Sequence, residues 1–422
     1  MINTYKRIMM GKSGFTLVEL LVVMVVFIVV IMITGDAFKT ILSQTAKVFR
    51  SEESNIEGVI GLEMLRHDIQ QGGYGLFTET SPVSYSEAAD SPASNNNETS
   101  NTAPPRAFVF RNNVGDGIED ATSESGNQYT VIEHSDYLTI KGLTTGVSAT
   151  AQKWTYLNNN LGVVTPNQWV SAAENLVTGE RAILLRRVIN SSGTTLTLVS
   201  EPTNHLLYFP FSGDAFSNYS INTPSYVVYG LNKPNNSNDE SRMPFNRVDY
   251  FVARPSDTGK VPSVCASNAG ILYKAAVNQS DGKLTYYPIL DCVADMQVVL
   301  GWDLLNGIAP GNDGIVDTWS DADGHTVTMA AGASYSATVA EVQAALLDPA
   351  ALRNSLKMIE IYVLAQNGRR DNSYISPSPI IVGGAGEESL SNSVDIAAAG
   401  WKNYRWKLYK IVVRPKNLLS NQ

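Results

Sequence analysis

The stretch "GKSGFTLVELLVVMVVFIVV", residues 11–30, is a short basic segment followed by an apolar run that holds one carboxylate, Glu19. The apolar run extends over residues 15–34, which matches the ~20 residues that a helix needs to cross ~30 Å of hydrocarbon. An unpaired acid inside a membrane helix costs about 2.5 kcal/mol or more. A plain membrane anchor therefore leaves the position of Glu19 unexplained.

The basic residues Lys6, Arg7 and Lys12 precede the apolar run. The positive-inside rule then predicts a single pass through a membrane, with the leader in the cytoplasm and the body outside. Two alternatives are a plain signal anchor and a cleavable secretory signal cut after Ala37, where "GDA" offers small residues. The run exceeds the 7–15 residues of a usual signal core, which argues against the cut.

The helical pattern continues beyond Ala37, and no proline before Pro82 forces a break, although Gly35 is a candidate weak point. Largely apolar residues recur at steps of three and four, which predicts one helix of more than fifty residues that becomes amphipathic in its second half. The pattern ends at the paired glycines Gly72-Gly73, which predict the end of the helix. The recurring positions are Phe38, Ile41, Leu42, Thr45, Val48, Phe49, Glu52, Ile56, Val59, Ile60, Leu65 and Ile69.

The sequence G-F-T-L-V-E after a short basic leader resembles the class III signal of type IV prepilins and of type II secretion pseudopilins. The resemblance implies that a prepilin peptidase cuts between Gly14 and Phe15, and that the new amine of Phe15 is methylated. It also implies that Glu19 pairs with the N-terminal amine of a neighbouring subunit during assembly. Because a lone carboxylate is costly in lipid, a partner ammonium accounts for the acid within the run.

The rest of the chain divides by composition. We expect a leader over residues 1–14, a spine helix over 15–74, a flexible linker or irregular segment over 75–105 and a body over 106–422. Short alternating segments separated by Gly, Asn, Pro and Asp predict an antiparallel β body, with a sub-domain boundary near 235–245. The predicted strands are "RAFVFR", "YLTIKG", "RAILLRRV", "TLTLVS", "SYVVYGL", "RVDYFVAR", "GILYKAAV", "MQVVLGWDL", "MIEIYVLAQ" and "YKIVVRP". The helix formers of 339–357 are the exception, and Pro349 divides them into two pieces. The fold class is therefore α+β, type IV pilin-like.

The order of the body segments resembles the PilW-type minor pilins. The resemblance rests on "HSDYLTIKG", "VTGERAILL", "NRVDYFVAR", "LDCVADMQVVLGWD", "KMIEIYVLAQNGRR" and the closing "YRWKLYKIVVRPKNL". It implies a subunit at or near the pilus tip that primes assembly with other major and minor pilins and with the inner-membrane assembly platform. After assembly the protein would belong to the extracellular pilus.

The chain has two cysteines, Cys265 and Cys292. An even pair behind an export signal favours one disulfide in an oxidising compartment. Closing that loop is worth roughly 3–4 kcal/mol in the chain-entropy account. The alternative is two unrelated buried thiols.

An Asp-rich loop suggests a calcium site, because Ca²⁺ prefers six to eight oxygen ligands. Its spacing does not fit the EF-hand pattern, and acidic Asn/Asp/Gly turns are also ordinary hairpin ends. The candidate ligands are Asp303, Asn312, Asp313, Asp317, Asp321 and Asp323.

Net charge and the absence of catalytic motifs disfavour two classes of function, nucleic-acid binding and catalysis. The net charge is −9, or −12 without the basic residues of the leader, which is unfavourable for general nucleic-acid binding. The sequence contains no Walker motif and no G-x-S-x-G motif, so we expect a structural protein and no catalytic site. The open alternatives are a minor pseudopilin of a type II secretion system, a tip adhesin or ligand-binding protein, and a tethered enzyme.

Overall fold

The computed structural model describes residues 17–123, 125–160, 163–190, 193–201, 203–213, 216, 225–233, 240–304, 313–384 and 388–418. For Glu19 and residues 33–57 it describes the helical backbone and not the side chains. The chain forms two compact units, residues 1–54 and 55–422. Helix α1 (Leu17–Gln71) is continuous over 55 residues, which confirms the predicted long helix without a break at Gly35.

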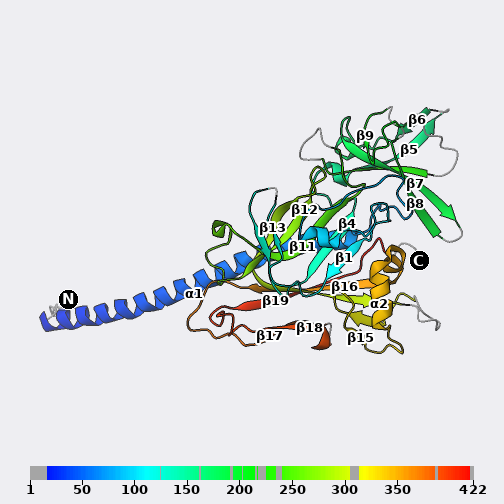
Figure 1. Ribbon diagram of the computed structural model, residues 1–422. Helices are drawn as coiled ribbons and strands as arrows, with labels where there is room; N and C mark the ends of the chain where they lie inside the picture. The colour runs from blue at the N-terminus through cyan, green and yellow to red at the C-terminus, as the bar shows by residue number, and fades with distance from the viewer. Residues whose placement is uncertain are drawn as a thin grey trace, which may run out of the picture. The chain divides into compact units, whose positions relative to one another are not determined.

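The main sheet is antiparallel throughout (Figure 1). Its central path is β1 (Phe108–Arg111), β4 (Tyr137–Gly142), β11 (Asn246–Pro255), β12 (Gly270–Val277), β13 (Leu284–Trp302), β14 (Thr318–Ser320) and β15 (Val327–Met329). Off this path, β13 also pairs with β16 (Leu356–Gln366), and β16 pairs with β19 (Trp406–Val413). At the other side, β11 pairs with β3 (Tyr129–Val131), which pairs with β2 (Glu119–Asp120).

A second sheet is inserted between β4 and β11. Its order is β6 (Val163–Pro166), β5 (Trp154–Asn160), β10 (Ser225–Gly230), β7 (Arg181–Asn190) and β8 (Gly193–Val199), and β9 (Phe209–Pro210) pairs with β7. The chain returns to the main sheet at Asn246, which lies opposite Gly142 in the β4–β11 register. The sub-domain boundary near 235–245 stays a prediction, since residues 55–422 form one compact unit.

The smaller elements complete the fold. Strands β17 (Ile380–Gly383) and β18 (Ser391–Val394) form a two-stranded sheet. Short 3-10 turns are η1 (Ala93–Asn96), η2 (Thr150–Gln152), η3 (Ala172–Glu174), η4 (Thr258–Lys260) and η5 (Glu388–Leu390). Helices α2 (Val339–Leu347) and α3 (Pro349–Ser355) confirm the predicted pair divided at Pro349.

Local chemistry sets the bounds of this helix pair. The Thr338 hydroxyl accepts a hydrogen bond from the Glu341 amide while the Glu341 carboxylate accepts from the Thr338 amide, a capping box that starts α2. The Asp348 side chain accepts from the Ala350 amide, and Pro349 takes the first position of α3, where its missing N–H costs nothing. Two separate caps therefore explain why one sequence stretch makes two helices.

The largest hydrophobic core joins the end of α1 to the main sheet and to one face of the second sheet. Leu65 and Ile69 of α1 are fully buried in it, together with Ile183 and Leu185 of β7. A second core underlies β17 and β18, and a third, rich in phenylalanine, lies on the other face of the second sheet. Because neighbouring residues of β7 belong to different cores, the second sheet is buried on both faces at its centre.

The sequence predicted either a flexible linker or an irregular segment over residues 75–105. The segment is irregular, and it is packed against the body. Apart from η1 it contains no regular element among its described residues. Phe77, Tyr85 and Ala93 are nevertheless 0–4% exposed, and their rings and methyl groups belong to the largest core. The Ser/Asn/Thr-rich composition concealed these few apolar anchors and the buried charges described below.

Candidate functional site

The N-terminal half of α1 displays apolar side chains on every side. All described residues from Leu17 to Met32 are large and apolar, and they are 48–82% exposed. A helix that is apolar all round belongs in lipid or among other helices, because water penalises each exposed side chain by roughly 1–2 kcal/mol. Within the described side chains, no helix has an apolar stretch long enough to qualify as a membrane span.

The residues on which the predicted processing depends are only partly within the described chain. Gly14 and Phe15 lie outside the described residues. Glu19 lies in the first turn of α1, but its side chain is outside the described part as well. Their roles in cleavage, methylation and subunit pairing stay predictions.

The last turns of α1 are amphipathic, as the spacing predicts. Leu62 and Leu65 face the core, whereas Val59, Ile60 and Met64 are 43–64% exposed. Three large apolar side chains on the outer face of a helix that is already docked form a surface available for another helix.

A buried ion pair fixes α1 to the main sheet, and sequence reasoning missed it. The Lys274 ammonium of β12 lies 2.6 Å from the Asp68 carboxylate, and the Tyr250 hydroxyl of β11 donates to the same carboxylate at 2.7 Å. The adjacent His67 has a raised pKa, chiefly because of its hydrogen bond to Asp68. Tyr250 lies 182 residues after Asp68 in the chain, and Lys274 lies further on. No local sequence pattern connects residues so far apart, so the contact could not be predicted.

Glycine allows α1 to approach β13 closely. A Cβ at Gly61 would lie 2.0 Å from the carbonyl oxygen of Ile289, a distance that no real contact reaches. A Cβ at Gly58 would instead meet the ends of the Leu290 and Tyr409 side chains at 3.1 and 3.4 Å, where the neighbours can move. Gly61 is therefore required for docking, although glycine inside a helix costs ~1 kcal/mol relative to alanine.

Buried charges bind the 75–105 segment to the main sheet. The Lys141 ammonium of β4 contacts Glu87 at 2.9 Å and Glu98 at 2.6 Å, and the Arg247 guanidinium of β11 contacts Glu87 at 2.7 Å and Asp249 at 2.9 Å. Burial alone would raise the pKa of Glu87, but Lys141 and Arg247 more than offset it, so the pKa is lowered. The five side chains form a network that holds the segment in place.

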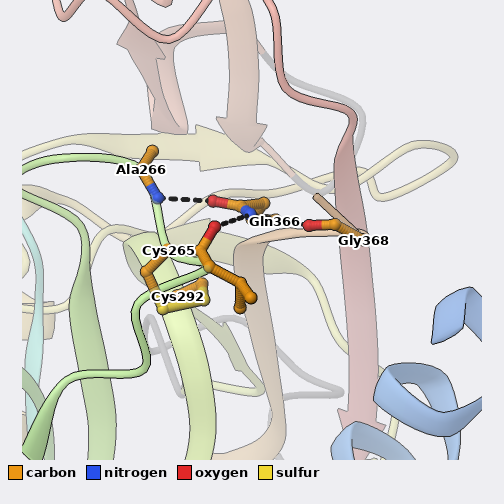
Figure 2. The surroundings of a disulfide bond; sticks show 6 residues. Cys265, Ala266, Cys292, Gln366 and Gly368 are labelled. Atoms are coloured by element: carbon orange, nitrogen blue, oxygen red, sulfur yellow. Dashed lines mark hydrogen bonds between the residues drawn. A yellow bond between two sulfur atoms is a disulfide. The ribbon is translucent and has the colours of Figure 1, made fainter. Parts of the chain in front are cut away.

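The predicted disulfide is present between Cys265 and Cys292, with their Cα atoms 4.9 Å apart (Figure 2). It joins the loop before β12 to strand β13. Beside it, Gln366 at the end of β16 accepts from the Ala266 amide at 2.7 Å and donates to the Gly368 carbonyl at 2.7 Å. The amide and the disulfide together fasten this loop to two strands.

Part of the Asp-rich loop forms ordinary hairpin contacts. Asp321 accepts from the Thr326 amide at 3.0 Å, and Asp323 pairs with His325 at 2.9 Å. Asn312, one of the candidate calcium ligands, lies outside the described residues.

Two of the remaining candidate ligands, Asp303 and Asp313, have other partners. Asp303 accepts from the Gly314 amide at 2.6 Å and lies 3.8 Å from the Lys357 ammonium, and Asp313 accepts from a backbone amide of its own turn. Burial raises the pKa of Asp317. Among the described residues no three His, Cys, Asp or Glu side chains form a group that could hold a metal ion, so the calcium site stays a prediction.

The comparison with known families identifies the N-terminal segment. Residues 9–35 match the prokaryotic N-terminal methylation motif, which includes the glycine, the aromatic residue and the acid discussed above. The chain therefore carries the class III signal of type IV prepilins, the motif of pilin-type and pseudopilin precursors. No curated protein and no solved structure matches the chain.

Proposed function

We propose that the chain is a minor pilin of a type IV pilus, similar to the PilW-type minor pilins. Prepilin peptidase removes residues 1–14 at the Gly14–Phe15 bond, and the amine of Phe15 is methylated. The apolar half of α1 first anchors the protein in the inner membrane, with the body in the periplasm. The same half then packs among the helices of other pilins at or near the tip, where the protein primes assembly and catalyses no reaction.

One observation carries this proposal: the methylation motif over residues 9–35 overlaps the start of a single 55-residue helix. The described apolar side chains of this helix from Leu17 to Met32 are exposed. A secretory signal peptide is removed from the mature protein, so it would not be expected to continue as a helix into the core of the body. The exposed group Val59, Ile60 and Met64 extends the available apolar surface to the docked half. Both features suit a helix that is buried among its neighbours in a filament.

A minor pseudopilin of a type II secretion system is the second candidate. It shares the methylation motif and would use the helix in the same way. Loss of surface pili on deletion of the gene, with protein secretion intact, favours the pilus. Loss of secretion with normal pili favours the secretion system.

The mature N-terminus tests the shared part of both proposals. The protein is purified from membranes of a host with an active prepilin peptidase, and its N-terminal peptide is sequenced by mass spectrometry. We expect the peptide to begin at a methylated Phe15, and a peptidase-deficient host serves as the control. A peptide that begins at Phe38, after a cut at Ala37, would refute the proposal.

A further inference from the structure

A cluster of aromatic side chains, two of them exposed, lies on the second sheet. We name it the aromatic ledge: Trp154 and Tyr156 of β5, and Trp169 in the turn after β6. Trp154 and Tyr156 are 40% and 39% exposed. The ring of Trp169 lies 5.0 Å from that of Trp154 and 5.9 Å from that of Tyr156, with interplanar angles of 62° and 73°.

Hydrogen bonds hold the ledge in one arrangement. The Trp169 indole N–H donates to the Trp154 carbonyl at 2.7 Å. The Asn175 side chain accepts from the Trp169 amide at 2.7 Å and donates to the Trp169 carbonyl at 3.0 Å. The Asn167 amide donates to the Tyr156 carbonyl at 2.8 Å. A surface ordered in this way loses little conformational entropy when it binds a ligand.

The fold does not need these rings for its core. The alternate residues of β5, Thr155 and Leu157, are the ones that point inward, at 2% and 6% exposed. On the ledge face, the neighbouring strand β10 is covered, because Tyr229 packs edge-on against Tyr74 with centroids 5.6 Å apart. At β5 that cover ends: the rings of Trp154 and Tyr156 are exposed, and Trp169 packs beside them partly buried.

The side chains around the aromatic ledge limit the chemical classes of ligand that it can bind. Residues 154–171 include no charged side chain, and the flanking Lys153 is paired with Glu180 at 2.8 Å. Nucleic acids and anionic lipids bind through cationic groups, which residues 154–171 do not supply. Asn158 and Gln168 instead offer exposed amide groups beside the rings. Aromatic faces with neutral amides match a sugar ring, which presents C–H bonds on one face and hydroxyl groups around its edge.

The size of the surface also favours a small ligand over a protein. An aromatic side chain has roughly 150–250 Å² of surface, so three rings exposed by about a third offer about 150–250 Å² in total. A stable protein interface needs about 800 Å² on each partner. We propose that the aromatic ledge binds a neutral oligosaccharide, with sugar rings stacked on Trp154, Tyr156 and Trp169. The inference does not depend on the assembly role proposed above.

The test uses the full chain in detergent on an array of neutral oligosaccharides with sialylated counterparts, single-stranded DNA and a proline-rich peptide as additional probes. The best glycan is then titrated while tryptophan fluorescence is recorded. We expect a neutral glycan to bind with a change in tryptophan emission, and Trp154→Ala and Tyr156→Ala each to weaken binding at least about tenfold. Tyr287→Ala is the matched control, because Tyr287 is 38% exposed on β13.

A second variant separates stacking from positioning. Trp169→Phe keeps a ring but removes the indole N–H that donates to Trp154, so we expect intermediate affinity. Retention of no neutral glycan on the array would overturn the proposal. So would retention of only DNA or the proline-rich peptide, or equal binding by Tyr156→Ala and Tyr287→Ala.

Discussion

At the scale of single residues, Lys141 has the most demanding position. Its ammonium is fully buried and paired with two carboxylates that are themselves 2% and 7% exposed. We expect Lys141→Met to lower the free energy of unfolding by about 3–5 kcal/mol, because Glu98 loses its closest cation and Glu87 one of two. Chemical denaturation of the full chain in detergent measures the loss.

Lys153→Met provides the matched control for this prediction. Lys153 also pairs with a glutamate at 2.8 Å, but the two side chains are 12% and 20% exposed. Partly solvated pairs contribute about 0–1 kcal/mol. Equal losses in the two variants would show that burial of the Lys141 network does not matter for stability.

Asp295 predicts a pH dependence with a definite sign. Burial raises the pKa of this carboxyl to about 6, although it accepts from Gln297 and Asn392 at 3.0 Å each. A proton held more tightly in the native state stabilises the protein fully below about pH 4, and this contribution is lost as the pH rises through about 6. The shift corresponds to at most about 3 kcal/mol.

Thermal melts of the wild type and Asp295→Asn between pH 4 and pH 7 measure this effect. We expect the wild type to lose melting temperature relative to Asp295→Asn as the pH rises, because only the wild type has this carboxyl to ionise. A constant difference across the range would contradict the raised pKa.

At the scale of elements, the contact of α1 with β13 depends on a glycine. We expect Gly61→Ala to destabilise the docked half of the helix by more than about 2 kcal/mol, because the added methyl group meets the backbone carbonyl of Ile289. Gly58→Ala is the control: there the new methyl group meets only movable side-chain atoms, so the gain in helix propensity offsets the crowding. Hydrogen exchange of the α1 amides over residues 58–71 reports the difference. Similar protection in both variants would refute the role assigned to Gly61.

The sequence predicted the strongly patterned elements and missed the weakly patterned ones. Strand β4 was predicted with its exact bounds, and Pro349 correctly divided α2 from α3. Strand β5 was missed because asparagine, a poor strand former, fills its last three positions. The first half of β13 was missed because it contains Pro288 and the exposed Tyr287.

The candidate site was predictable in the same uneven way. Two cysteines allow only one pairing, so the disulfide followed from composition and export. The network around Lys141 and Arg247 did not, because its partners are separated by up to 160 residues in the chain. No local pattern connects a polar, proline-containing segment to buried cations in strands that follow much later.

At the scale of the whole molecule, Glu19 is expected to act only in the assembled state. Glu19→Ala removes a carboxylate from the apolar run, so membrane insertion should be unchanged or improved, while the partner for a neighbouring N-terminal amine is lost. We expect the variant to accumulate in the membrane fraction and to be reduced several-fold in sheared pili. Glu19→Asp, which keeps the charge on a shorter side chain, should retain part of the incorporation. Wild-type amounts of Glu19→Ala in sheared pili would refute this mechanism.

The second sheet leaves the main sheet after Gly142 and rejoins it at Asn246, directly across the same pair of strands. Residues 143–245 thus form a closed detour whose entrance and exit are adjacent, so its length and content do not alter the register of β4 and β11. Recombination can therefore exchange this cassette while residues 1–142 and 246–422 stay as they are. The exchange has one fixed condition: a replacement must again cover the core that Ile183 and Leu185 now seal. Diversification of this protein should therefore concentrate in the part of the detour that faces outward, which is where the aromatic ledge lies.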